Sequence, residues 1–153
     1  MTNGYARPTG NVPGRCAGFA MPYLSFHVSR DVSQSQAQAV ADTLTELTAT
    51  LLGKKRELTA VEITSAMPGR WYVGAQDVAR QSQVGFYLDI KVTEGTNTKG
   101  EKAQYIDAVF AAMAEIFGDV APASYIVIHE VHADAWGYAG QTQEYRYIRG
   151  KAL

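Results

Sequence analysis

Apolar and polar positions begin to alternate directly after Pro22. Leu24, Phe26 and Val28 are apolar, and the residues between them are polar. A period of two is typical of a β-strand with one buried face. A proline at this point fits, because the first residue of a strand can do without its ladder N–H. The pattern therefore predicts a half-buried strand that Pro22 opens.

The next segment has the period of a helix. Ser33 and Gln36 fit a capping box, in which each side chain satisfies a free backbone N–H of the first turn. Apolar residues then recur at helical spacing, at Val40, Leu44, Leu47 and Leu51. Gly53 stands where a left-handed residue commonly ends a helix. A helix is predicted between Ser33 and Gly53, with Lys54, Lys55 and Arg56 forming a solvated basic turn after it.

A second strand is predicted from Leu58 to Ala66, and Pro68-Gly69 breaks it. A short aromatic segment, residues 70–74, follows.

The same succession starts again at Phe86, with alternation through Val92. Thr98 and Glu101 form a second capping box, and the helix after them ends at Gly118. A strand from Tyr125 to Val131 and an aromatic turn, residues 136–140, come next. The spacing of Tyr145, Tyr147 and Ile148 predicts a short closing strand.

The two halves align with each other at a nearly constant offset. The first strand matches the later one at an offset of 64 residues, and Gly53, Ile63 and Trp71 match Gly118, Ile128 and Trp136 at 65. This indicates a duplicated strand-helix-strand unit. A right-handed crossover makes the two strands of each unit parallel. The predicted fold class is α+β, a four-stranded mixed sheet with both helices on one face.

The other face of that sheet needs a cover, and self-association supplies one. The domain is expected to span residues 22–153, with pseudo-repeats 22–82 and 83–150. Residues 1–21 are rich in Gly and Pro and have no hydrophobic period, which predicts a flexible N-terminal extension.

Composition narrows the class of protein. A net charge of −1 gives no electrostatic reason to expect nucleic acid or an anionic membrane as a partner. No apolar run has the length of a membrane span. A single cysteine, Cys16, excludes an intramolecular disulfide and makes a reducing cytoplasm the expected compartment.

Three features together resemble the 4-oxalocrotonate tautomerase superfamily in its long form, in which two β-α-β units are fused. They are the strand that starts Met-Pro-Tyr, the capped helix that ends Leu-Leu-Gly-Lys-Lys, and the late strand followed by Trp136-Gly137-x-x-Gly140. The resemblance covers residues 22 to about 145. It implies a homotrimer that acts on a small-molecule carboxylic acid and uses no metal or cofactor.

The resemblance also implies chemistry at Pro22. In the family, an amino-terminal proline lies in an apolar pocket and its amine acts as general acid and base. Here Pro22 would carry such an amine after removal of residues 1–21, or if Met21 were the start. The aromatic positions Trp71 and Trp136 correspond to an active-site wall, and burying area between subunits is an equally good interpretation of them.

The family's substrate-binding arginines are absent from their usual positions. Arg30 lies next to one of these positions, while Glu62 and Tyr125 occupy the strand position in the two units. Tyr125 could donate a hydrogen bond instead, and Arg70 is the other arginine placed at the mouth of the pocket. Thr93 and Thr96 stand where dehalogenases and decarboxylases of the family carry an arginine pair, which favours tautomerisation.

Two alternatives stay open. One is a non-catalytic trimer with a blocked proline, and the other is a hydratase, decarboxylase or dehalogenase of a short unsaturated or keto acid. His129 and His132 suggest a metal site at first sight, but their spacing on a strand directs them to opposite faces, so no metal is expected.

Overall fold

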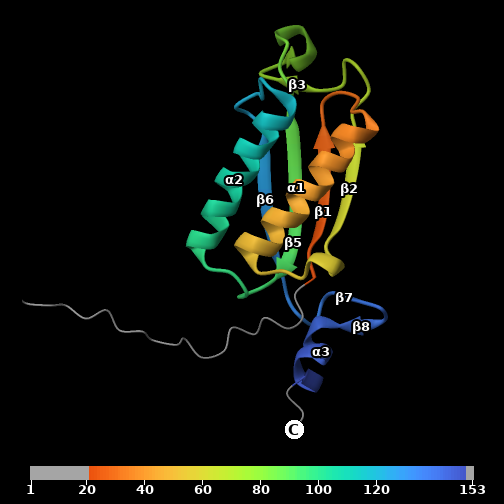
Figure 1. Cartoon of the computed structure of the whole chain (residues 1–153), viewed down its shortest axis with the longest axis vertical. Helices are drawn as coiled ribbons and strands as arrows, with labels where there is room; N and C mark the ends of the chain where they lie inside the picture. Colours follow the sequence, from red (N-terminus) through yellow and green to blue (C-terminus); the bar gives the residue numbers. More distant parts are fainter. Residues whose placement is uncertain (1–20, 151–153) are drawn as a thin grey trace, which may run out of the picture.

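The computed structural model describes residues 21–150. Its centre is a four-stranded sheet in the order β2-β1-β5-β6 (Figure 1). The strands are β1 Tyr23–Val28, β2 Ala60–Ser65, β5 Phe86–Thr93 and β6 Tyr125–Val131. β1 pairs with β2 and β5 with β6 in parallel, and the two central strands β1 and β5 are antiparallel. The predicted α+β fold with a mixed sheet is confirmed.

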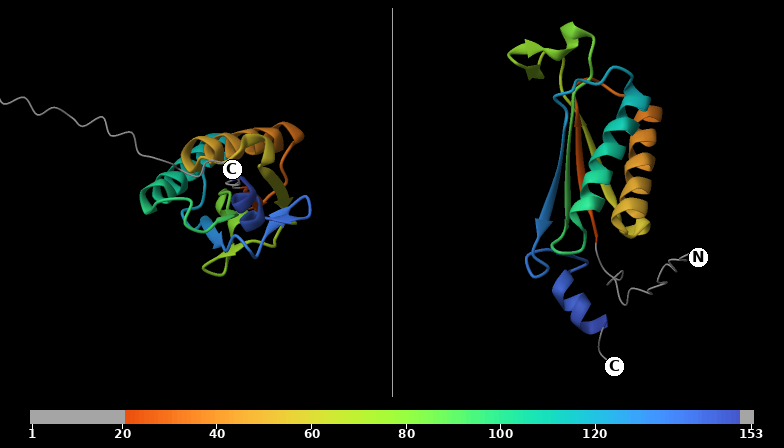
Figure 2. Two further views of the ribbon diagram at one scale, coloured as in Figure 1. Left: turned by 90° about the horizontal axis from the view of Figure 1, so that it is seen from below. Right: turned by 90° about the vertical axis from the view of Figure 1, so that its left-hand side faces the viewer.

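Two helices cover one face of this sheet, as Figure 2 shows. They are α1 Gln34–Leu52 and α2 Lys99–Phe117. Both predicted capping boxes are present, with Ser33 accepting from the N–H of Gln36 and Thr98 from that of Glu101. α1 ends at Gly53, whose φ of 64° lies in the left-handed region that glycine adopts without cost.

The core lies between the helices and the sheet. Every second residue of the two central strands points into it and is fully buried. These residues are Leu24, Phe26, Val28, Phe86, Leu88, Ile90 and Val92. Phe26 stacks on Phe86 with ring centroids 5.5 Å apart, which joins the two units across the antiparallel pair. In the helix layer, Thr48 of α1 and Tyr105 of α2 share a buried hydrogen bond of 2.9 Å.

The internal repeat is visible element by element. α1 and α2 start at Gln34 and Lys99, 65 residues apart, and β2 and β6 start at 60 and 125. Each unit then adds a small hairpin at the same offset. The first consists of β3 Tyr72–Val73 and β4 Gln76–Asp77, and the second of β7 Gly137–Tyr138 and β8 Gln141–Thr142.

The two hairpins lie at opposite ends of the sheet (Figure 1). The β3–β4 hairpin, with the 3-10 helix η2 Val78–Gln81, lies at the end where β1 finishes. The β7–β8 hairpin lies at the end where β1 starts, together with the helix α3 Gln143–Gly150.

The prediction of a short closing strand at Tyr145, Tyr147 and Ile148 is wrong, because this segment is the helix α3. Thr142 Oγ1 accepts a hydrogen bond of 3.1 Å from the backbone N–H of Tyr145, which starts the first turn. Arg149 donates to the hydroxyl of Tyr145 one turn earlier, at 3.2 Å. The second strand is also shorter than Leu58 to Ala66, because a 3-10 turn, η1 Arg56–Leu58, precedes it.

The second face of the sheet has no covering element among residues 21–150 (Figure 2). Its side chains come from the alternate positions of all four strands and are mostly polar, with tyrosines among them. The predicted N-terminal extension, residues 1–21 with Cys16, lies outside the described residues except for Met21. Its predicted flexibility therefore stays a prediction.

Candidate functional site

Pro22 is buried directly before β1. Its carbonyl oxygen accepts a hydrogen bond of 3.3 Å from the N–H of Ala60, so the strand ladder to β2 begins at the proline. The ring therefore has a fixed position at the end of the sheet.

The β7–β8 hairpin packs against the same end of the sheet. Thr93 is the last residue of β5, and its Oγ1 accepts a hydrogen bond of 3.3 Å from the indole Nε1 of Trp136. The carbonyl of Trp136 accepts from the N–H of Gln143 at 3.0 Å, which joins the hairpin to α3. Because β1 and β5 are antiparallel, with Tyr23 opposite Lys91, Thr93 and Pro22 belong to the same end. Trp136 thus lies at the end of the sheet where β1 starts.

The motif Trp136-Gly137-x-x-Gly140 has a structural reason at each glycine. A Cβ on Gly137 would lie 2.1 Å from the carbonyl oxygen of Gln141 on the paired strand, so only glycine fits. Ala139 and Gly140 have φ of 46° and 73°, the left-handed pair that a two-residue hairpin turn needs. A cavity of about 300 Å³ is lined by residues of this hairpin, from Asp134 to Thr142.

Lys54 is buried at this end and is not the solvated residue that the sequence predicted. Only 5% of it is exposed, and its Nζ donates to Thr96 Oγ1 over 2.7 Å. Thr96 in turn donates to the carbonyl of Thr93. Burial lowers the pKa of Lys54 to about 8, although the acidic groups of Glu101 and Glu130 oppose the change.

Most of the substrate-binding residues predicted from the sequence lie at the other end of the sheet. Arg30 follows β1 and holds its guanidinium 5.6 Å from the ring centre of Phe117. Trp71 packs its indole against Gly85, the residue before β5, so closely that a Cβ there would lie 2.7 Å from Nε1. Tyr125 starts β6 and is 61% exposed.

Arg70, next to Trp71, belongs to this far end as well. The six residues of β1 separate it from Pro22, a length of about 20 Å. Of the substrate-binding residues predicted from the sequence, only Trp136 therefore lies at the same end of the sheet as Pro22 within one chain.

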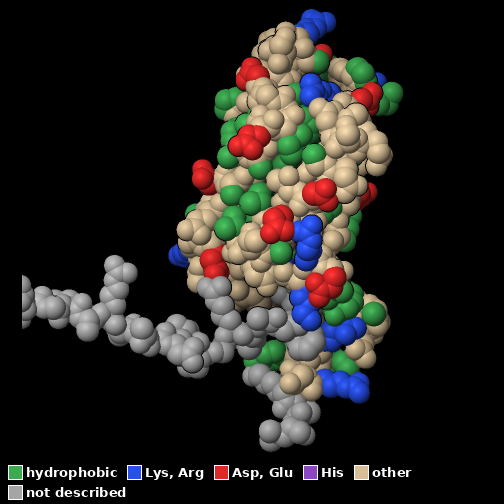
Figure 3. All heavy atoms as spheres, viewed as in Figure 1, with side chains coloured by type: hydrophobic (Ala, Val, Ile, Leu, Met, Phe, Trp, Pro, Cys, Tyr) green, Lys and Arg blue, Asp and Glu red, His purple; other side chains and the backbone are tan. Residues whose placement is uncertain are grey.

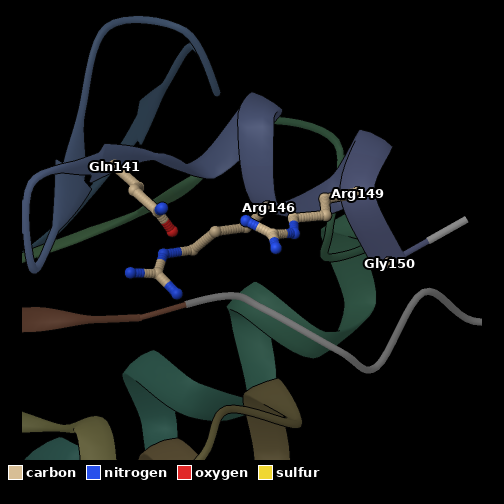
Figure 4. A pocket seen from close by; sticks show the side chains of 4 residues that line it. All are labelled: Gln141, Arg146, Arg149 and Gly150. Atoms are coloured by element: carbon tan, nitrogen blue, oxygen red, sulfur yellow. The ribbon is translucent and has the colours of Figure 1, made fainter. Parts of the chain in front are cut away.

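Sequence reasoning missed two arginines at the Pro22 end, Arg146 and Arg149. Both belong to α3, and together with Gln141 and Gly150 they line a cavity of about 290 Å³. Figure 4 shows the side chains of Arg146 and Gln141 approaching each other beneath the hairpin. The spacing of three residues between the arginines is a helical signal. The predicted strand hid it, because neighbours three apart point to opposite faces of a strand.

A cluster of charged side chains lies on the open face of the sheet. Asp89 accepts from Lys91 at 2.9 Å and pairs with His129 Nε2 at 2.7 Å. On β1 and β2, the hydroxyl of Tyr23 donates to Glu62, and this hydrogen bond raises the pKa of Tyr23. Within residues 21–150, no group of three or more His, Cys, Asp and Glu side chains is arranged to hold a metal ion.

Comparisons with known proteins agree with this architecture. Residues 87–145 match the family model described as Tautomerase enzyme. Comparison with curated protein sequences gives no match. Within the described part of the chain, no helix combines the length and the apolar character that crossing a membrane requires.

Solved structures with the same fold cover nearly the whole domain. A macrophage migration inhibitory factor-like protein from Entamoeba histolytica has 19% identity and a TM-score of 0.67, over 80% of this chain and 98% of that one. A fused 4-OT, described as a wild type asymmetric trimer, has 14% identity and a TM-score of 0.72, over 81% and 98%. Pt0534 inactivated by 2-oxo-3-pentynoate gives the same four values.

Identities this low establish the fold alone. The family model matches the second unit, residues 87–145. The element-by-element repeat relates the first unit to the second. The second unit therefore resembles the tautomerase family, and the chain as a whole has the fold of the fused 4-OT structures, with two β-α-β units in one chain.

Proposed function

We propose that the protein is a cofactor-independent isomerase that moves a proton on a small enol, keto or unsaturated carboxylic acid. Pro22 is the general acid and base, once residues 1–21 are removed and its nitrogen is a free secondary amine. The observation that carries the proposal is the buried proline at the start of β1, at the sheet end that Trp136 and the β7–β8 hairpin close.

In this mechanism the neutral amine accepts a proton from one atom of the substrate and returns it to another. Burial favours the neutral form of an amine, so that Pro22 can act as a base near neutral pH. Trp136 limits the access of water to the reacting atoms. No net oxidation or group transfer occurs, so the reaction needs no second substrate.

The same proposal includes assembly into a homotrimer through the open face of the sheet. That face has no cover among the described elements, and the fused 4-OT structures that share the fold are described as trimers. In such an assembly, Arg30, Arg70 and Tyr125 of a neighbouring copy are the residues available to complete the pocket around Pro22.

Replacement of Pro22 tests the proposal. In the mature chain, Pro22→Ala should lower kcat/KM for phenylpyruvate or 2-hydroxymuconate by about 100-fold or more, the usual contribution of a general base. Pro68→Ala, in the turn after β2, is the matched control and should keep wild-type activity. Undiminished turnover in Pro22→Ala would exclude the mechanism. So would an intact mass from the native host showing residues 1–20 still attached.

One observation favours a second candidate, a non-catalytic trimer. Arg30 and Arg70 lie at the far end of the sheet, and Glu62 at the family's arginine position is hydrogen-bonded to Tyr23. This candidate predicts a stable trimer by light scattering in which 3-bromopropiolate does not label Pro22. Labelling of Pro22 with loss of activity would reject it.

A further inference from the structure

We infer that Arg146, assisted by Arg149, binds the carboxylate of the substrate, in place of the arginines that are missing from the strand positions. The inference deepens the proposed function and rests on it for the identity of the reaction. It makes α3, a helix outside the two β-α-β units, the part of the chain that selects small acids.

The Arg146 guanidinium is fixed in place without being neutralised. Its Cζ lies 3.9 Å from the ring centre of Tyr138, and its Nη2 donates to the carbonyl of Tyr138 over 3.0 Å. This stacking and hydrogen bond orient the planar group before any ligand arrives. Among residues 21–150, no carboxylate forms an ion pair with Arg146 or Arg149.

Arg146 also has one buried donor that is not used within the chain. Its Nε is buried and has no hydrogen-bond partner. A guanidinium offers five N–H donors, and a carboxylate accepts two of them side by side. A buried polar atom without a partner is costly, so a ligand oxygen that satisfies it gains affinity.

The buried amide of Gln143, in the first turn of α3, is further evidence for a ligand site. Gln143 is only 3% exposed, and neither its Oε1 nor its Nε2 has a partner. Its backbone N–H donates to the carbonyl of Trp136, so Gln143 belongs to the junction between α3 and Trp136. Unsatisfied buried donors in two neighbouring side chains indicate a site for a polar ligand.

The position of the cavity connects it with Pro22. The cavity of about 290 Å³ is lined by Gln141, Arg146, Arg149 and Gly150, a size that suits a small molecule. In Figure 4, Arg146 extends from α3 toward the start of β1, the strand that Pro22 precedes. Figure 3 shows Lys and Arg side chains gathered at this end of the molecule.

A second cavity that contains an arginine differs from it in charge. It lies along α1 and is lined by Asp42, Thr43, Glu46, Leu47 and Arg56, and there Arg56 is paired with Glu46. An arginine already paired with a carboxylate has less to offer a second one. The contrast favours Arg146 as the carboxylate-binding group.

Binding of phenylacetate, an unreactive small carboxylate, tests the inference without any turnover. Titration by calorimetry should show affinity about 10- to 100-fold weaker for Arg146→Ala than for wild type, the range for loss of a charge-assisted hydrogen bond. Arg146→Lys should recover part of the affinity, because it restores the charge but not the planar fork. Methyl phenylacetate should bind wild type and Arg146→Ala equally.

The matched control is Arg80→Ala, an exposed arginine in η2 beside the equivalent hairpin of the first unit. It should bind phenylacetate like the wild type. Phenylacetate affinity of Arg146→Ala within about twofold of wild type would overturn the inference and leave Pro22 untouched. Carboxylate binding that depends on Arg146 in a protein whose Pro22→Ala variant turns over normally would uphold the inference and reject the proline mechanism.

Discussion

At the scale of single residues, Lys54 occupies an unusual environment. A buried ammonium is disfavoured, and the pKa of Lys54 falls to about 8 from its ordinary 10.5 because of that burial. Its Nζ donates a hydrogen bond to Thr96, in the loop that follows β5. Lys54 therefore joins the end of α1 to the loop at the end of the sheet where Pro22 lies, at some cost in stability.

The cost predicts how stability varies with pH. Between about pH 8 and 10.5 the unfolded chain binds a proton at Lys54 and the folded chain does not, so raising the pH favours the folded state. From pH 7 to 9.5 the free energy of unfolding of the wild type should rise by about 2 kcal/mol relative to Lys54→Met. Urea unfolding of both proteins at the two pH values measures the difference. Parallel changes in both would contradict the effect.

Tyr105 acts in the opposite direction at higher pH. Burial in the core raises its pKa to about 12, although the hydrogen bond with Thr48 lowers it somewhat. Above pH 10 the unfolded chain loses the phenolic proton before the folded chain does, so stability falls. The comparison for Lys54 is therefore made below pH 10, and Tyr105, present in both proteins, cancels from it.

At the scale of elements, the two small hairpins occupy equivalent places in the repeat and have separate partners. The first turns through Gly74 and Ala75 and the second through Ala139 and Gly140, both with positive φ. Two-residue turns of this kind match the twist of the strands they join. The second hairpin continues into α3 with its two arginines, so the carboxylate binding that we infer for Arg146 belongs to one copy of a duplicated element.

Gly137 is the residue on which that hairpin depends. Gly137→Ala should destabilise the protein by about 1–3 kcal/mol, because the new methyl group would collide with the backbone of Gln141. Relative to the wild type, amide hydrogen exchange in Gly137→Ala should speed up more in β7, β8 and α3 than in the central strands. Ala139→Gly, in the turn, is the control and should stay within about 0.5 kcal/mol of wild type. Unchanged protection of β7 and β8 in Gly137→Ala would contradict this account.

At the scale of the whole molecule, the sheet has one face packed and one face open. The open face carries the pair of Asp89 with His129 and the exposed rings of Tyr23 and Tyr125. Val127 lies among them, beside Asp89 in the register of β5 and β6. A surface that mixes tyrosines, valine and paired charges suits a partner surface better than bulk solvent.

Val127→Lys tests whether this face is the interface of the proposed trimer. A lysine here can remain solvated in a monomer but would be buried in an assembly, so light scattering should show a shift from trimer toward monomer. Far-UV circular dichroism should be unchanged, because Val127 is outside the core. Ala111→Lys, on the exposed side of α2, is the control and should remain trimeric. A fully trimeric Val127→Lys would exclude the open face as the interface.

The sequence by itself determined the elements that are defined by local pattern. Alternation marked β1 and β5, the capping boxes and Gly53 marked the ends of the helices, and the offset of 65 residues marked the duplication. Each of these signals lies within a few residues of the element it specifies, so it can be read without knowing the fold. The mixed sheet followed from two right-handed crossover units placed side by side.

The tertiary structure decided which residues meet. Arg30, Arg70 and Trp71 lie away from Pro22 because they follow the parallel strands β1 and β2. The antiparallel pairing of β1 with β5 places Tyr125 at that same end and Trp136 at the end where Pro22 lies. The segment from Tyr145 to Ile148 alternates like a strand, yet Thr142 and the docked hairpin start it as a helix. The aromatic support of Arg146 and the burial of Lys54 likewise depend on contacts between distant segments, and local pattern carries no information about these.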